Sequence, residues 1–314
     1  MTVTSNAAVD ELAGQSRGVL VTGANGHLGR RLLRRLSASP SLALRALVRS
    51  ATAAARLSGL EGDAVTVGDY RDPAVLSKAL GDCDSVVHFV GIIKESRGNS
   101  FHDAHVATTR SLLEVAERQG VRRIVYLSIV GSAPEAQNNC LRSKGEAEAL
   151  LRASSIPATI LRVPMVLGEG DYASAALRKR ALAGRTLVFR AASLEQPIYA
   201  GDVIDAVLQA LCRRDEATQS LDLPGPELLS RASLIQRAAL VLGQQVEVRS
   251  LPIGFGYTAA WVLERLLANP PFTRAMLGVL DHDDEASNAE ALRELGLELT
   301  ELDETLRRCL ELAG

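Results

Sequence analysis

The side chains best suited to nucleophilic or proton-transfer chemistry are those of Ser128, Cys140 and Lys144. Ser128 ends the strand-like run 122–128, and open α/β sheets bind their ligands at the carboxyl ends of strands. Lys144 can bind a hydroxyl or carry a proton; the structural alternative is an exposed lysine paired with Glu148 one helical turn later. Cys140 offers a thiol, which acts as a nucleophile or metal ligand only as the thiolate. We treat these three residues as the candidate catalytic group.

Phosphate binding is predicted by three glycines that follow the apolar run 19–21. Gly23 permits a tight turn after a strand, Gly26 lets a ligand approach bare backbone, and Gly29 lets the next helix pack closely on the strand. The N-terminus of that helix presents free N–H groups and a positive dipole end, which suit a pyrophosphate. We therefore predict a dinucleotide site whose loop also contains Ala24, Asn25, His27 and Leu28.

Two further strand ends extend this predicted cofactor site. Arg49 directly follows the strand-like run 42–48, at the point where an acidic residue would bind ribose hydroxyls and a basic one accommodates a 2′-phosphate. NADP(H) is therefore the favoured cofactor, with NAD(H) as the alternative. Val90 and Gly91 end the run 85–91, where a glycine again allows a ligand to approach the backbone.

The histidines carry a weaker signal. His88 lies within an apolar run and is interpreted as a core residue. His102 and His105 are three residues apart at the start of a helical segment, but no third metal ligand is apparent nearby. We therefore predict no metal site and assign both to a structural or substrate-adjacent role.

Composition excludes several classes of function. The chain has 314 residues with 35 basic and 37 acidic side chains, so net charge gives no reason to expect a nucleic-acid partner. The four cysteines are scattered, as in a reduced intracellular protein. Residues 1–16 show no leader pattern and are predicted to be a disordered tail, and no apolar run is long enough to span a bilayer. These features favour a cytoplasmic protein.

Strand and helix patterns alternate from Gly18 to Arg162, which predicts an α/β fold with a Rossmann-type, doubly wound parallel sheet. We place the NAD(P)-binding domain at residues 17–168, with 198–223 returning to it. Residues 169–197 and 224–314 form a smaller C-terminal α/β domain for a substrate or partner. Within it, the segment 261–277 carries an apolar helical stripe that packs on its own domain or faces a partner or lipid surface.

The Gly-x-x-Gly-x-x-Gly spacing, with Thr22 before it, resembles the extended or atypical branches of the short-chain dehydrogenase/reductase superfamily. The resemblance continues at residues 139–164. It implies that Lys144 binds the ribose, that Pro164 flanks the nicotinamide, and that Asp69 and Tyr70 lie beside the adenine. The superfamily's Tyr-x-x-x-Lys motif has Cys140 in place of the tyrosine, which implies that the cysteine is not catalytic.

Residues 88–95, the turn at 270–274 and the segment 295–297 narrow the resemblance to proteins like the NADPH-binding accessory subunit of respiratory complex I. This favours a cofactor-binding accessory or regulatory protein. The alternative is an active NADPH-dependent reductase or isomerase, as in the isoflavone-reductase-like (NmrA-like) branch, in which Lys144 and Ser128 act on a small molecule. The substrate, the oligomeric state and the choice between a small-molecule and a protein partner are left open.

Overall fold

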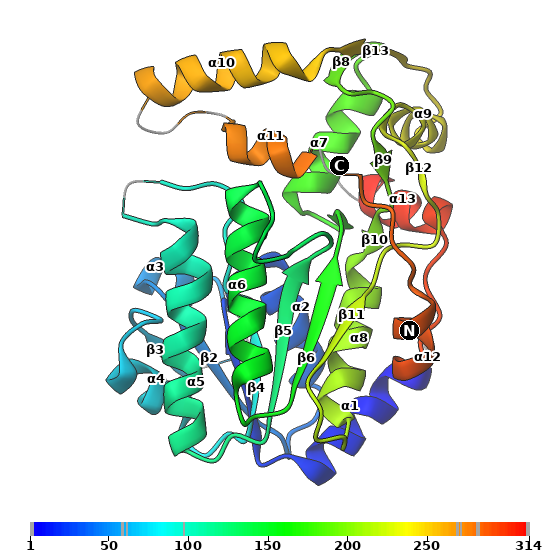
Figure 1. Cartoon of the computed structure of the whole chain (residues 1–314). Helices are drawn as coiled ribbons and strands as arrows, with labels where there is room; N and C mark the ends of the chain where they lie inside the picture. The colour runs from blue at the N-terminus through cyan, green and yellow to red at the C-terminus, as the bar shows by residue number, and fades with distance from the viewer. Residues whose placement is uncertain are drawn as a thin grey trace.

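A computed structural model describes residues 3–57, 60, 62–96, 98–267, 270, 272–280 and 283–311 (Figure 1). Its centre is a seven-stranded parallel sheet in the order β11-β6-β5-β4-β1-β2-β3. The strands are β1 (Gly18–Thr22), β2 (Ala43–Val48), β3 (Val65–Val67), β4 (Ser85–His88), β5 (Arg123–Ile129), β6 (Ala158–Val163) and β11 (Gln219–Asp222). The strand order reverses between β1 and β4, which creates the crevice where such sheets bind ligands. The predicted doubly wound sheet is confirmed.

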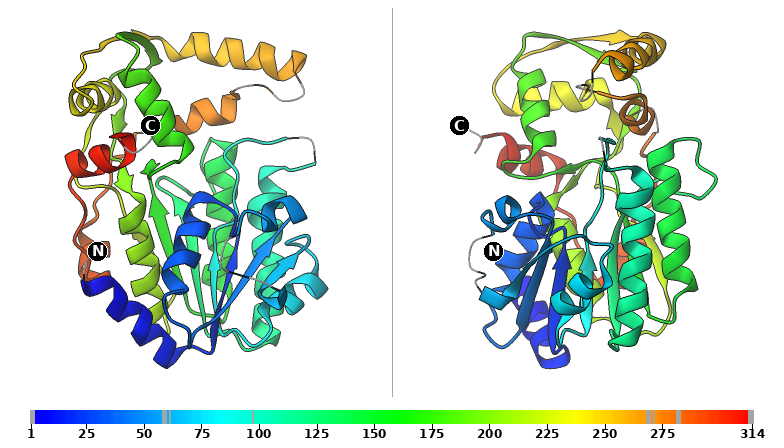
Figure 2. Two further views of the ribbon diagram at one scale, coloured as in Figure 1. Left: turned by 180° about the vertical axis from the view of Figure 1, so that it is seen from behind. Right: turned by 90° about the vertical axis from the view of Figure 1, so that its left-hand side faces the viewer.

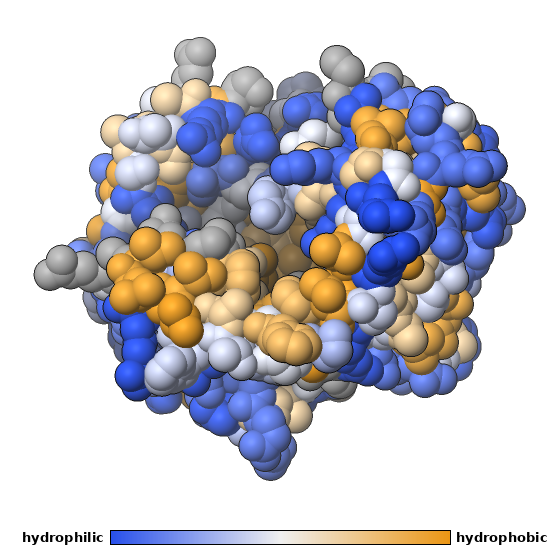
Figure 3. Space-filling view, turned by 90° about the horizontal axis from the view of Figure 1, so that it is seen from above, coloured by the Kyte–Doolittle hydropathy of each residue, from blue (hydrophilic) through white to orange (hydrophobic). Residues whose placement is uncertain are grey.

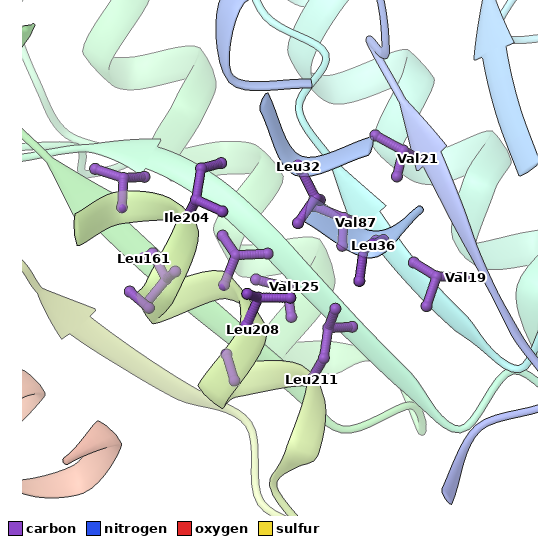
Figure 4. Close-up of a cluster of buried hydrophobic side chains, with 14 of the residues drawn as sticks. Val19, Val21, Leu32, Leu36, Val87, Val125, Leu161, Ile204, Leu208 and Leu211 are labelled. Carbon is purple, nitrogen blue, oxygen red and sulfur yellow. The ribbon is translucent and has the colours of Figure 1, made fainter. Parts of the chain in front are cut away.

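Helices cover both faces of the sheet (Figure 2). One face carries α2 (His27–Leu36) and α8 (Ala200–Cys212), and the other carries α4 (Pro73–Leu80), α5 (Thr108–Arg118) and α6 (Asn139–Ala153). Because the central strands are buried on both sides, their residues are mostly apolar on both faces. Figure 4 shows the hydrophobic core between the sheet and the helices α2 and α8. In it, Val21 and Val125 of the sheet cluster with Leu32 of α2 and Leu208 of α8.

The N-terminal segment differs from the prediction of a disordered tail. Val3–Gln15 forms helix α1, which packs against α8 and buries Ala8, Val9 and Leu12 in the sheet core. Ser16 then donates a hydrogen bond to the buried carboxylate of Asp84 at 2.5 Å. The prediction was wrong for the described part of residues 1–16 because alanine supplies part of the buried face, and alanine gives little hydropathy contrast.

A second group of elements lies above the carboxyl edge of the sheet (Figure 1). Its helices are α7 (Tyr172–Ala181), α9 (Arg231–Val241), α10 (Ile253–Leu266), α11 (Arg274–Leu280) and α13 (Leu302–Glu311), and its longest strands, β8 (Arg185–Phe189) and β13 (Glu247–Leu251), pair in parallel. Short strand pairs join β7 (Val166–Leu167) to β10 (Ile198–Tyr199) and β9 (Leu194–Glu195) to β12 (Leu229–Ser230). A separate hydrophobic core joins α7, α9 and α13 to β7, β8 and β10, whereas α10 and α11 contribute no residue to it.

One helix departs from the predicted domain boundary. α12 (Ala289–Leu295) falls in the segment 224–314. Its residues Ala291 and Leu295 are nevertheless buried in the core that the sheet shares with α2 and α8, where α12 contacts α8 and β11. Its seven residues are too few to show a clear periodicity. The use of the upper group of elements as a substrate domain stays a prediction.

Candidate cofactor and ligand site

The turn between β1 and α2 has the backbone that the three glycines predict. Gly23 has φ +69°, and a Cβ there would lie 2.9 Å from the carbonyl carbon of Phe89. A Cβ on Gly29 would lie 2.7 Å from the carbonyl oxygen of Gly23. Both distances are too short for a side chain, so the turn requires glycine at these two positions. The turn at Gly23 therefore lies directly against the backbone of Phe89, the residue that follows β4.

The N-terminus of α2 is open to an anion. Gly26 is the N-cap residue and has no side chain to accept a hydrogen bond. The first N–H groups of the helix therefore remain available to donate to a ligand. The side chain of His27 is turned aside, because its Nε2 accepts a hydrogen bond from Arg31 Nε at 3.2 Å. Burial and the charge of Arg31 lower the pKa of His27. The imidazole is therefore held neutral beside the helix end.

A cavity of about 520 Å³ opens over this turn. Eight of the residues predicted to bind cofactor line it: Gly23, Asn25, Gly26, Arg49, Asp69, Tyr70, Val90 and Gly91. They come from the ends of β1, β2, β3 and β4, which meet at one edge because the strands are parallel. Ala24, His27, Leu28, Lys144 and Pro164 do not line the cavity; Ala24 and Leu28 pack into the core, and Pro164 separates β6 from β7. Each residue's contact with cofactor stays a prediction.

One end of the cavity is built from charged side chains. Arg49 donates a hydrogen bond to Asn99 Oδ1 at 3.3 Å, and Arg71 contacts both Asp69 and Asp103. The hydrogen bond from Arg71 lowers the pKa of Asp69. Asp69 is thus an ionised carboxylate already paired with a cation, whereas the partner of Arg49 is a neutral amide.

Lys144 lies under the other end of the cavity. Its Nζ donates to the carbonyl oxygen of Leu127 at 2.7 Å and stands 4.5 Å from the ring centre of Tyr126. Burial lowers its pKa from 10.5 to about 8. A Cβ on Gly91 would come within 3.2 Å of Lys144 Nζ, so the glycine is what brings the cavity close to the ammonium group.

Cys140 is fully buried one turn before Lys144 on α6. Its Sγ lies 3.5 Å from the carbonyl oxygen of Ile92, in the geometry of a thiol donor. Burial raises the pKa of Cys140 to about 11, so the thiol is protonated at neutral pH. Cys140 lines neither this cavity nor the larger second cavity described below.

Ser128 does not join the other two candidate catalytic residues. Its hydroxyl donates to Glu148 Oε1 at 2.6 Å, and the same buried carboxylate also accepts from Arg152 and Arg162. The serine lies below the strand end, on the face of the sheet that α6 covers, and it lines neither cavity. This geometry gives no support to the predicted catalytic role of Ser128, which stays a prediction.

His105, for which the sequence predicted a structural or substrate-adjacent role, contributes to this site through its hydrogen bonds. Ser143 Oγ donates its hydrogen to the carbonyl oxygen of Cys140, so it accepts from His105 Nδ1 at 2.8 Å. His105 Nε2 then accepts the backbone N–H of Ile92 at 3.0 Å. Burial lowers the pKa of His105 to about 2, which keeps the ring neutral for this task. The ring thus fixes the chain segment next to Gly91.

The backbone around His105 is unusual, because residues 102–107 form a π-helix before α5 begins. This register leaves carbonyl groups without their usual donors four residues later. The hydroxyls of Thr108 and Thr109 donate to Ala104 O at 2.7 Å and to His105 O at 2.6 Å. The exposed His102 makes no comparable contact among the described residues, whereas His88 is buried as predicted, with Nδ1 2.6 Å from Thr22 Oγ1.

A second, larger cavity of about 1060 Å³ lies beside the first, between the loop 91–101, the start of α6 and the helices α10 and α11. Figure 3, seen from above, shows a hollow on this face with apolar side chains gathered beside it. Residues of the loop 91–101 line both cavities, Gly98 and Asn99 on one side and Glu95 and Ser96 on the other. The described part of this loop, residues 91–96 and 98–101, therefore lies between the two cavities.

Two other types of site are not seen in the described part of the chain. No three His, Cys, Asp or Glu side chains there are grouped to hold a metal ion. No helix within the described ranges is long and apolar enough to cross a membrane.

Known proteins support the cofactor assignment. The profile of the NAD(P)H-binding family matches residues 23–211. A ceramide reductase of Caulobacter vibrioides is 32% identical over 205 residues, which cover 64% of this chain and 63% of that protein. Subunit 9 of the NADH dehydrogenase [ubiquinone] 1 alpha subcomplex of Arabidopsis thaliana is 28% identical, with 69% of this chain and 56% of that protein covered. The chain thus spans less than two thirds of each of these relatives.

Solved structures agree on the fold. The UDP-glucose 4-epimerase of Thermus thermophilus, solved with NAD, aligns over 94% of this chain and 98% of its own, with a TM-score of 0.69 and 18% identity. At that identity the likeness concerns the fold alone. Together with the family match, the glycine turn and the cavity above it identify the chain as a member of the NAD(P)H-binding family, within the atypical short-chain dehydrogenase/reductase superfamily.

Proposed function

We propose that the protein is an accessory or regulatory binder of NADP(H) that lacks the fast carbonyl reduction typical of its superfamily. The cofactor would occupy the 520 Å³ cavity, with its pyrophosphate at the N-terminus of α2 and its nicotinamide above Gly91. Lys144, under that glycine, would then bind the nicotinamide ribose. The proposed cytoplasmic location rests on the sequence alone.

The preference for NADP(H) over NAD(H) rests on Arg49. It lines the cavity after β2 and its described hydrogen bond goes to a neutral amide, Asn99, which a phosphate can replace as acceptor. The nearby carboxylate of Asp69 is held by Arg71 and is thereby less available to a ribose diol. Arg49 would pair with the 2′-phosphate that only NADP(H) carries.

The observation that carries the accessory role is the state of Cys140. In tyrosine-dependent reduction, a phenol gives its proton to the oxygen of the carbonyl while the cofactor supplies hydride to its carbon. Cys140 has a shorter side chain, is fully buried, and directs its thiol to Ile92 O. It is therefore poorly placed to deliver a proton to a substrate.

The larger cavity supports a second candidate, an NADPH-dependent reductase or isomerase acting on a small molecule. A pKa of about 8 lets Lys144 exchange a proton near neutral pH, and one relative is named as a ceramide reductase. Ser128 was part of this alternative as predicted from sequence, but its bond to Glu148 leaves the proton-transfer role to Lys144 alone.

The experiment that tests the proposal follows NADPH oxidation over a panel of aldehydes and ketones with wild type, Cys140→Ser and Cys140→Tyr. We expect tight NADPH binding in all three, measured by cofactor fluorescence, and little turnover in wild type or Cys140→Ser. Brisk wild-type turnover that Cys140→Ser abolishes would show that the cysteine is catalytic. Brisk turnover that Cys140→Ser keeps and Lys144→Met abolishes would favour the second candidate.

A further inference from the structure

One side of α10 is both apolar and exposed. Phe255, Val262 and Leu266 recur at helical spacing and are 71%, 39% and 75% exposed. The opposite side holds Gly256 and Ala260, the buried residues of this helix. α10 therefore presents to solvent the kind of apolar stripe that a helix ordinarily turns toward a core.

The edge of this apolar side is formed by an aromatic ring and a cation. Trp261 and Arg265 are one helical turn apart and both are exposed, with the guanidinium carbon 4.2 Å from the centre of the ring. The single carboxylate of α10, on Glu264, is turned to Arg274 of α11, which donates to it at 2.8 Å. The exposed side of α10 thus carries a positive charge and an amphipathic ring next to its apolar stripe.

The paired strands β8 and β13 continue this surface. Val188 is buried in the core, so its neighbour Leu187 points to the other face, where it is 58% exposed. Arg249 of β13 is aligned with Leu187 and is also exposed. A Cβ on Gly256 would lie 3.1 Å from the ring of Phe189, so β8 and α10 are in direct contact. Figures 1 and 2 show these three elements together at the end of the molecule opposite α1.

The segments that build this end of the molecule are basic. Residues 178–190 and 247–280 contain eight lysines and arginines and two glutamates, a formal charge of +6 in a chain whose net charge is −2. Each of the two glutamates is contacted by at least one arginine of the same segments. The rest of the chain is therefore acidic, and the positive charge is concentrated at the end that also exposes the apolar side of α10.

This combination favours one occupant over others. A second copy of the chain, docked through the same face, would bring two strongly positive surfaces together. A nucleic acid would pair with the cations but would leave the apolar stripe in water. The surface of an anionic bilayer satisfies both, because lipid phosphates pair with lysine and arginine while the boundary of the acyl chains takes up the apolar side of a helix.

We propose that α10, together with the outer face of β8 and β13, binds the surface of a bilayer that contains anionic phospholipids. The helix lies in the plane of the interface, with Phe255, Val262 and Leu266 toward the acyl chains. Trp261 and Arg265 lie at the level of the headgroups, where such rings and cations are stable. This surface goes beyond the proposed function, since it requires neither cofactor nor turnover.

Trp261 is a built-in reporter for the test, because it is the single tryptophan of the chain and belongs to the proposed surface. The full chain is titrated with vesicles of phosphatidylcholine alone and with vesicles of phosphatidylcholine and phosphatidylglycerol in equal amounts. Binding is measured by co-sedimentation and by Trp261 emission. We expect the anionic vesicles to bind at least about tenfold more tightly. Trp261 emission should shift to the blue and be quenched by lipids with brominated acyl chains.

The apolar contribution is tested with two leucines on different helices. Leu266→Asn, on the proposed surface, should weaken binding to anionic vesicles by about tenfold, because the side chain no longer enters the acyl region. Leu240→Asn is the matched control, since Leu240 is 64% exposed on α9 and lies outside that surface. It should change binding by less than about twofold. NADPH titration of each variant checks that the fold is intact.

The charge contribution is tested with two pairs of arginines. Arg249→Gln combined with Arg265→Gln removes two positive charges from the proposed surface and should weaken binding to anionic vesicles by about tenfold or more. Arg34→Gln combined with Arg118→Gln removes two exposed charges from the last turns of α2 and α5. This control changes the net charge equally, so it should leave most of the binding in place.

Four results would overturn the proposal. One is failure of wild type to bind the anionic vesicles, and another is equal binding to both kinds of vesicle. The third is an equal loss of binding in a variant and its matched control. The fourth is binding that depends on the arginines but not on Leu266 and leaves Trp261 emission unchanged. That result would assign the basic end of the molecule to a soluble polyanion or an acidic protein.

Discussion

The two cavities of this protein are built from different material. The smaller one is formed by backbone at the ends of four parallel strands, where Gly23 and Gly29 leave no room for a Cβ. The larger one is formed mainly by side chains of a loop and three helices, among them Tyr257, Glu264 and Arg274. A backbone site is fixed by the fold and tolerates few changes. A side-chain site can change its ligand without disturbing the sheet.

The largest loss of NADPH affinity is expected from a substitution in the backbone-built cavity. Gly23→Ala places a Cβ 2.9 Å from Phe89 C at a residue with φ +69°. The left-handed conformation alone costs about 1–2 kcal/mol, and the contact adds to it. We expect NADPH affinity to fall by more than about tenfold, because the turn must shift, and the melting temperature to fall.

The matched control is Gly254→Ala on α10, where an added Cβ meets nothing within 4 Å. Cofactor fluorescence and thermal denaturation are measured for both variants. Equal losses of NADPH affinity in the two variants would remove the distinction between backbone-built and side-chain-built sites.

A next, smaller effect is expected at Arg49. Arg49→Ala should raise the Kd for NADPH by roughly tenfold or more, since a hydrogen bond to a charged group contributes about 1.5–3 kcal/mol. The Kd for NADH should stay the same, because NADH has no 2′-phosphate. Isothermal titration with both cofactors is the measurement. If wild type binds both equally and the variant does too, Arg49 has no part in cofactor choice.

Lys144 gives a pH-dependent effect of moderate size. If its ammonium form binds the ribose, NADPH affinity should fall as pH rises through about 8, the pKa that burial gives it. Lys144→Met should bind more weakly at pH 7 and lose this dependence. The pKa is lower than the usual 10.5, so the unfolded state binds more protons between pH 8 and 10.5. This group alone therefore makes stability rise with pH in that window.

Both parts are checked by NADPH titrations and urea unfolding from pH 6.5 to 10. Arg142→Met, on the same helix but at its partly buried outer side, serves as the control for loss of a cation. A pH profile that is identical in wild type and Lys144→Met would assign the titration to another group.

The smallest effect is expected on the outer side of α10. Leu266 is 75% exposed, so Leu266→Asn should change the free energy of unfolding by no more than about 0.5 kcal/mol. NADPH affinity should not change. Urea unfolding and cofactor titration measure these quantities. A loss of stability comparable to that of Gly23→Ala would mean that α10 is part of the cooperative core.

For a physical reason, the sequence indicated which residues gather around the backbone-built cavity, although their contacts with cofactor stay a prediction. Glycine is required where φ is positive or two chains come close, so Gly23, Gly29 and Gly91 mark the turn and the strand end directly. Alternating apolar runs then place those turns at one edge of the sheet. Arg49 was placed there because it directly follows a strand-like run, whereas Asp69 and Tyr70 were placed there by the resemblance to the short-chain dehydrogenase/reductase superfamily.

The larger cavity could not be predicted in the same way. Its described lining residues come from three separate stretches, which include Glu95 and Phe101, Gly131 and Leu141, and Tyr257 and Gly278, and which meet only through tertiary packing. The position of Ser128 near a strand end also did not predict which neighbour its hydroxyl meets; here that neighbour is Glu148. His105 was noticed, but its bond to Ile92 depends on a helical register that side-chain patterns do not encode.

That register has a consequence for how the family can vary. A π-helical turn contains one residue more than the α-helical turn it replaces, so residues 102–107 behave as a one-residue insertion held within an intact helix. Removing one residue there would leave a good helix and rotate everything before it by about 100° relative to α5. His105 would lose Ile92 although no side chain had been substituted. The placement of the segment beside Gly91 thus depends on the number of residues in the helix. A relative that lacks one residue at this point would hold the segment beside Gly91 by different contacts.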